Sequence, residues 1–253
     1  MEGTTPQKLR ILSDSSQPFV DREEAGILLA GALREYAGKK AVVLGIPRGG
    51  IVVAREIARA LGAQLDIVLA HKLRTPGQEE LAMGSVSEDG KVFLNQQVVQ
   101  HLDVGDPYIQ QEKASQLAEI RRRTEIIRKV RPKVSLKGRI VIVTDDGVAT
   151  GSTTQAAFWA VRTEQPQKLI AAIPVGPEDT ITRLAKDVDE MVCLRTPPYF
   201  SAVGQFYQRF YQVEDEEMLQ ILKEEQNGMV ETRTESFTKV INFKRAPRRG
   251  VEE

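Results

Sequence analysis

Two adjacent aspartates and a short hydroxyl-rich loop are the residues of this sequence best suited to chemistry. Asp145 and Asp146 directly follow residues 140–143, a β-branched run that predicts a strand buried on both faces. The loop after them contains Thr150, Gly151, Ser152, Thr153 and Thr154, and residues 156–161 predict a helix. The acid pair and the loop therefore lie between the carboxyl end of a strand and the start of a helix.

This arrangement can bind a ligand with two different ends. Backbone N–H groups and the helix dipole at a helix start favour a phosphate, and Gly151 allows the backbone to approach it closely. The aspartates repel a phosphate, but they suit vicinal hydroxyl groups or a cation. A phosphate near a diol describes ribose 5-phosphate. The plainer alternative is a surface turn between a strand and a helix.

A second unit follows the same order of strand, loop and helix. Residues 41–46 predict a buried strand, Pro47, Arg48, Gly49 and Gly50 form the loop, and a helix is expected from about residue 52 to 61. The glycines expose backbone N–H groups, and Arg48 can bind a phosphate through two hydrogen bonds. Alone, the loop is also compatible with a Pro-Gly turn that carries a solvated arginine.

A third group of cationic residues follows the predicted strand 64–70. His71, Lys72 and Arg74 come first, and residues 81–87 and 91–95 then predict a hairpin about residues 88–90. Basic residues beside a glycine-bearing segment suit a lid over a polyphosphate. A solvated connection is the alternative.

The remaining elements complete an alternating pattern. Residues 107–131 predict a long helix whose arginines and lysines favour a solvated face over a polyanion site. Strands at 168–173 and 190–194, with a helix at 179–186 between them, predict a parallel sheet with right-handed crossovers. In such sheets ligands bind at the carboxyl ends of the strands, where every loop described above lies.

Composition limits the partners. Lys+Arg and Asp+Glu are both 35, so the net charge is zero and gives no case for nucleic acid as a partner. Cys193, the only cysteine, is expected in the core and favours a reducing compartment, taken to be the cytoplasm. No membrane segment is predicted. The partners expected are small molecules, and a homodimer stays open.

The chain divides into three parts. Residues 1–18 form a polar N-terminal segment, residues 19–224 form the main domain, and residues 225–253 form a polar tail. Aromatic residues gather in 197–211, and a last helix is expected at 214–223. This clustering predicts a cap over the end of the sheet.

The segment 140–154 resembles the phosphoribosyl diphosphate (PRPP) signature of the type I phosphoribosyltransferases. The whole resemblance covers about residues 19–224 and is closest to a subgroup whose acceptor is unassigned. The other matching positions are Pro47-Arg48-Gly49-Gly50, Lys72, Pro76-Gly77, Glu80-Leu81-Ala82, Val203-Gly204 and Phe206-Tyr207. The resemblance implies an α/β fold with a central, mainly parallel sheet flanked by helices. It also implies a flexible lid hairpin and a small hood, mainly residues 195–224 with the N-terminal helix.

The resemblance implies an enzyme that uses PRPP and Mg²⁺ to transfer ribose 5-phosphate to an acceptor, with roles for particular residues. The catalytic residues would be Arg48, Lys72, Asp145 and Asp146. PRPP would be bound by Arg48, Gly49, Gly50, Lys72, Arg74, Asp145, Asp146, Ala149, Thr150, Gly151, Ser152, Thr153 and Thr154. The acceptor pocket would include Val175, Tyr199 and Phe200. No direct protein ligand is expected for Mg²⁺, which would be held mainly through the substrate near the acid pair.

One position departs from the pattern of the enzymes that use 6-oxopurines. These carry an aspartate immediately before the Thr-Gly of the phosphate loop, whereas this chain has Ala149. Guanine and hypoxanthine are therefore disfavoured as acceptors. Two other functions stay open: a regulatory protein that binds PRPP without turnover and, less favoured by the zero net charge, an RNA-binding regulator.

Overall fold

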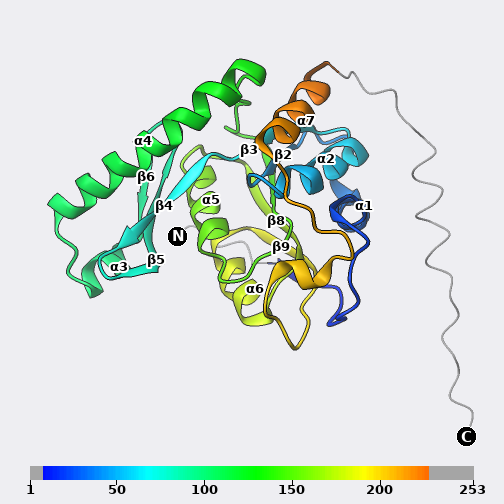
Figure 1. Ribbon diagram of the computed structural model, residues 1–253, viewed down its shortest axis with the longest axis horizontal. Coiled ribbons are helices and arrows are strands. Elements are labelled where there is room, and N and C mark those ends of the chain that lie inside the picture. Colours follow the sequence, from blue (N-terminus) through cyan, green and yellow to red (C-terminus); the bar gives the residue numbers. More distant parts are fainter. Residues whose placement is uncertain (1–7, 228–253) are drawn as a thin grey trace, which may run out of the picture.

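The computed structural model describes residues 8–227, which fold around a six-stranded sheet (Figure 1). Its strand order is β1-β9-β8-β7-β2-β3, and every neighbouring pair is parallel. The strands are β1 Lys8–Ile11, β2 Val42–Gly45, β3 Gln64–Ile67, β7 Ile140–Thr144, β8 Lys168–Val175 and β9 Glu190–Arg195. The predicted α/β fold with a central parallel sheet is confirmed.

Helices cover both faces of this sheet, which explains the continuous apolar runs of its strands. The helices are α1 Arg22–Ala32, α2 Gly50–Leu61, α5 Ser152–Arg162, α6 Glu178–Leu184 and α7 Asp215–Asn227. Alternate residues of β7 face opposite sides. Ile142 packs into the core that α1, α2 and α7 cover, whereas Val141 and Val143 pack into the core under α5 and α6.

Residues 70–130 form a separate unit, here called the lid module. It contains an antiparallel sheet and two helices: β4 Ala70–Thr75, β5 Gln78–Ser87, β6 Val92–Leu94, α3 Gln96–His101 and α4 Asp106–Val130. Figure 1 shows α4 lying along this small sheet, to one side of the six-stranded sheet. The module has its own apolar cluster, in which Leu73 and Met83 of the sheet meet Ile109 and Ile120 of α4. The predicted hairpin is confirmed, but it belongs to a larger structure with a core.

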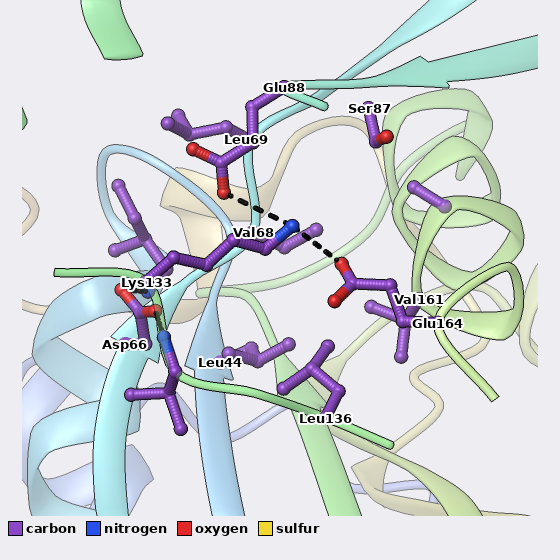
Figure 2. Close-up of a pocket in the computed structure, with 13 residues that line it drawn as sticks. Leu44, Asp66, Val68, Leu69, Ser87, Glu88, Lys133, Leu136, Val161 and Glu164 are labelled. Carbon is purple, nitrogen blue, oxygen red and sulfur yellow. Dashed lines mark hydrogen bonds and ion pairs between the residues drawn. The ribbon is translucent and has the colours of Figure 1, made fainter. Parts of the chain in front are cut away.

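Charged side chains join the lid module to the central sheet. Arg128 of α4 donates to Asp66 of β3 over 2.7 Å and to both carboxylate oxygens of Glu88 over 2.7 Å. Figure 2 shows Lys133 between Glu88 and Glu164, in the turn after α5, at 3.7 and 3.0 Å, beside a cavity of about 20 Å³. That volume is enough for one water molecule. The prediction that the basic residues of α4 form a solvated face is thus wrong for Arg128.

Some elements were not anticipated from the sequence. β1 pairs only with β9, at the edge of the sheet, and α3 is a single short helix. The predicted strand 64–70 is two strands in different sheets, because the chain leaves the central sheet after Ile67. Within residues 8–227, no helix is both long and apolar enough to cross a bilayer. Residues 1–7 and 228–253, and with them most of the predicted tail, lie outside the described part.

Candidate functional site

The acid pair and the glycine loop lie against each other at the carboxyl edge of the sheet. β2 and β7 are neighbours, with Gly45 paired to Thr144, so the loops that follow them leave side by side. A Cβ atom on Gly49 would lie 2.0 Å from Asp146 Oδ2, and one on Gly50 would lie 3.0 Å from Asp145 Oδ1. Only glycine at positions 49 and 50 therefore allows the loop to approach the acid pair so closely. The peptide bond between Pro47 and Arg48 is cis.

Both aspartates are half-buried, and their environment disfavours two full charges. Burial, and then the neighbouring carboxylate of Asp146, hold the pKa of Asp145 well above its ordinary value. Burial also raises the pKa of Asp146, although the charge of Arg22 opposes that increase. Asp145 Oδ1 accepts a hydrogen bond from the Asp146 N–H at 2.9 Å. The pair therefore suits a ligand that donates hydrogen bonds or carries positive charge.

Arg22 connects the acid pair to the hood and was not identified from the sequence. Its Nε donates to Asp146 Oδ2 at 2.8 Å, and its Nη1 donates to the Tyr211 carbonyl oxygen at 2.7 Å. Its guanidinium carbon lies 3.9 Å from the centre of the Phe210 ring. The Tyr207 hydroxyl donates to the Asp146 carbonyl oxygen. Because Arg22 and Asp146 are 124 residues apart, no local pattern could have indicated this pair.

The hydroxyl-rich loop forms the start of α5. Gly151 has a φ of +76°, and the helix begins at Ser152 without a side-chain cap on its first N–H groups. Thr180 of α6 donates to the Ala149 carbonyl oxygen at 3.1 Å, and Arg183 donates to that of Thr150. Thr150 Oγ1 lies 3.2 Å from Ser152 Oγ. The loop is thus fixed by α6, and its backbone donors can meet an anion.

A cavity of about 310 Å³ separates this edge of the sheet from the lid module. Residues from the glycine loop, the lid module and the start of α5 all line it. Among them are Pro47, Lys72, Arg74, Arg123 and Thr153. The structure thus brings together three segments that the sequence had linked to phosphate binding.

The remaining predicted site residues are distributed around the hood. Val175 is buried, and a Cβ atom on Gly147 would lie 3.1 Å from its Cγ1. Phe200 packs on Phe206, with ring centres 5.1 Å apart, whereas the Tyr199 side chain is 85% exposed. Arg48 lies 3.6 Å from Glu214 and 3.8 Å from Asp215, at the start of α7. Val175 therefore lies against the loop that follows the acid pair, whereas Tyr199 is exposed to solvent.

The residues near the acid pair fit a metal ion that is shared with a substrate. The described residues contain no cluster of three or more His, Cys, Asp or Glu that could hold an ion by themselves. Mg²⁺ keeps several waters and binds through one or two carboxylates together with substrate phosphates. Asp145 and Asp146 can accept hydrogen bonds from such waters, so an ion held by the substrate needs no direct protein ligand here.

Comparison with known proteins gives a consistent result. Residues 23–208 match the family model described as "Phosphoribosyl transferase domain". Two curated Mycobacterium tuberculosis proteins, MT0597 and Rv0571c, each named "Putative phosphoribosyl transferase", are 45% identical over 206 residues. The match covers 81% of this chain and 46% of each relative, so this chain spans about half their length. The crystal structure of TT1426 from Thermus thermophilus has a TM-score of 0.79 and 43% identity, covering 82% of this chain and 99% of that one.

Proposed function

Because this chain belongs to the phosphoribosyl transferase domain family, we propose that it transfers ribose 5-phosphate from PRPP to a small acceptor. We infer that the reaction requires Mg²⁺ and that the acceptor is a nitrogenous base other than a 6-oxopurine. The observation that carries this proposal is the contact of the acid pair with Gly49 and Gly50, close to the start of α5. Sites for a diol, a pyrophosphate and a 5-phosphate then share one edge of the sheet.

Each group of residues has a separate role in this proposal. The first N–H groups of α5 and the hydroxyls of Thr150 to Thr154 bind the 5-phosphate, which supplies binding energy away from the reacting carbon. Asp145 and Asp146 accept hydrogen bonds from the ribose hydroxyls. Gly49 and Gly50, with Arg48, Lys72 and Arg74, stabilise the charge that develops on the departing pyrophosphate. When bound, Mg²⁺ would neutralise part of that charge.

The direct test is turnover with a panel of bases. Purified protein is incubated with PRPP, Mg²⁺ and each base, and released pyrophosphate is measured. Release that depends on one base supports the transferase. PRPP binding without release for any base would favour a regulatory protein that uses the same pocket. No PRPP binding at all would reject both functions.

Lys72→Ala is expected to lower turnover more than PRPP affinity. The lysine lines the cavity beside Pro47, where the pyrophosphate gains charge as it leaves, so its contribution is larger in the transition state than in the bound substrate. We expect kcat to fall by about tenfold or more, the loss of one charge-assisted hydrogen bond. Exposed Lys129→Ala is the matched control. A loss of PRPP affinity with unchanged kcat would show that Lys72 stabilises the bound substrate and the transition state equally.

Guanine and hypoxanthine are expected to be poor acceptors. Ala149 supplies no proton-transferring group, and β8 ends at Val175 without a lysine there for a purine carbonyl. Each unpaired buried polar group costs about 1–3 kcal/mol, so discrimination of about tenfold per missing group is expected. Kinetics with adenine, guanine and hypoxanthine measure this, and Ala149→Asp alone should not make guanine a good acceptor. Efficient formation of the guanine nucleotide would contradict this view of the pocket.

A further inference from the structure

The arginine at the start of α1 stands where a positive charge does not help the helix. Arg22 is the first residue of α1, and the dipole at a helix start disfavours a cation. Asp21 already caps this helix, because its carboxylate accepts from the N–H of Glu24 at 3.0 Å. Arg22 is only 9% exposed. A nearly buried cation needs partners, and those of Arg22 come from other parts of the chain.

One partner belongs to the acid pair and two belong to the hood. Nε of Arg22 donates to Asp146 Oδ2 at 2.8 Å, in an ion pair whose side chains are 11% and 16% exposed. Nη1 donates to the Tyr211 carbonyl oxygen at 2.7 Å, and the Phe210 ring centre lies 3.9 Å from the guanidinium carbon. A planar guanidinium can hydrogen-bond in its plane while it stacks on a ring, which an ammonium group cannot do. Arg22 is therefore held in one orientation against Asp146.

The part of the hood that holds Arg22 is itself closely packed. The Phe210 ring stacks on Tyr207 with ring centres 5.1 Å apart, and a Cβ atom on Gly204 would lie 2.9 Å from the Phe210 ring. The Tyr207 hydroxyl also donates to the Asp146 carbonyl oxygen. The hood thus fixes the backbone of Asp146 through Tyr207 and its carboxylate through Arg22.

The ion pair leaves Asp146 able to bind a ligand. A carboxylate has about four acceptor positions on its two oxygens, and Nε of Arg22 takes one of those on Oδ2. Burial raises the pKa of Asp146, and the charge of Arg22 opposes that increase. The arginine therefore favours the ionised carboxylate, which only accepts hydrogen bonds and so suits a hydroxyl group as donor.

We propose that Arg22 is a positioning residue for the ribose diol: supported by the hood, it holds the Asp146 carboxylate in the orientation that accepts a hydrogen bond from a ribose hydroxyl. This inference rests on the proposed function, in which the acid pair binds the diol. It adds a residue from outside the loops that carry the resemblance. Removing Arg22 should weaken recognition of the hydroxyl groups and spare phosphate binding at the start of α5.

The experiment compares two ligands that share a phosphate and a five-membered ring. Ribose 5-phosphate carries hydroxyl groups on its ring, whereas tetrahydrofurfuryl phosphate lacks them. Their dissociation constants are measured by ligand-detected NMR, and their ratio gives the preference for the hydroxyl groups. We expect Arg22→Gln to lower this preference by about tenfold, the scale of one charge-assisted hydrogen bond. The affinity for tetrahydrofurfuryl phosphate should stay within about twofold, because the phosphate site is unchanged.

Two further variants complete the comparison. Arg209 is another arginine of the hood, but it pairs at 2.5 Å with Asp21, outside the acid pair, and its side chain is 57% exposed. Arg209→Gln is the matched control and should keep the preference within about twofold. Arg22→Lys keeps the charge without the planar fork, and should lower the preference by about threefold. This milder variant carries the test if the melting curve shows that Arg22→Gln does not fold.

The outcomes separate this inference from the proposed function. If the unmodified protein prefers ribose 5-phosphate and the Arg22 variants keep that preference in full, the role of Arg22 is overturned and the diol site stands. A stronger preference in Arg22→Gln would also overturn it, because Arg22 would then compete with the ligand. Equal losses for both ligands would show a purely structural role. No preference in the unmodified protein would reject the diol site of the proposed function, and this inference with it.

Discussion

Replacing both acidic residues at the end of β7, Asp145→Asn with Asp146→Asn, is expected to weaken PRPP binding by about 100-fold or more. Each charge-assisted hydrogen bond to a ribose hydroxyl contributes roughly 1.5–3 kcal/mol, and about 1.4 kcal/mol corresponds to a factor of ten. The amide keeps the shape of the carboxylate but loses its charge. Calorimetric titration of PRPP with Mg²⁺ measures the effect. Unchanged affinity in the double variant would show that the diol site lies elsewhere.

Asp145→Asn alone supplies the stability control. Because the pKa of Asp145 is raised, the folded protein keeps the Asp145 proton at pH values above 3.8, the ordinary pKa, where the unfolded chain has lost it. The free energy of unfolding therefore decreases as the pH rises from that value towards the raised pKa. Above the raised pKa, the full cost of burying the Asp145 charge is present. Asn removes the penalty, so the melting temperature near neutral pH should be at least that of the unmodified protein. A clear decrease would mean that the Asp145 charge stabilises the fold.

Gly49→Ala is expected to weaken PRPP binding by about 10- to 100-fold, although Gly49 carries no functional group. The added Cβ would lie 2.0 Å from Asp146 Oδ2 and 2.9 Å from Arg22 Nε, so the acid pair or the loop must move. Displacing one carboxylate forfeits a charge-assisted hydrogen bond of roughly 1.5–3 kcal/mol to the ligand. PRPP titration at saturating Mg²⁺ measures the loss.

Gly31→Ala is the matched control for this change. Gly31 lies in α1, and a Cβ atom there would meet nothing within 4 Å. Alanine also favours a helix over glycine by about 1 kcal/mol, so this variant should be as stable as the unmodified protein or more so. PRPP affinity in Gly31→Ala should be unchanged. If Gly49→Ala binds PRPP as tightly as this control does, the loop is not part of the site.

The parts of the site that the sequence predicted are those encoded locally. The acid pair, the glycine loop and the start of α5 each follow a buried strand directly, and parallel strands place such loops at one edge. Arg22 and Arg123 were not predicted as site residues, because each reaches the site only through long-range packing. The residues around Arg22 do not indicate a partner in the loop after β7, and the spacing of arginines in α4 does not show which face meets a cavity.

The full extent of the lid module was not predicted either, because it too depends on long-range contacts. A hairpin is visible in the sequence as two short strands about a turn. That β4 leaves the central sheet, and that α4 returns to cover the hairpin, depends on the packing of Leu73 and Met83 against Ile109 and Ile120. These contacts join residues far apart in the chain, which periodicity within either element cannot reveal.

Asp66 lies where the chain enters the lid module and also where it returns. Its carboxylate accepts from Arg128, near the end of α4, at 2.7 Å and from the N–H of Val134 at 3.0 Å. The two ends of the module therefore meet at one residue of the central sheet. The entropy of closing a loop grows only slowly with its length, so the sheet can accept a long insertion here at little extra cost. We therefore expect a change in the length of this insertion to leave the edge that carries the acid pair in place.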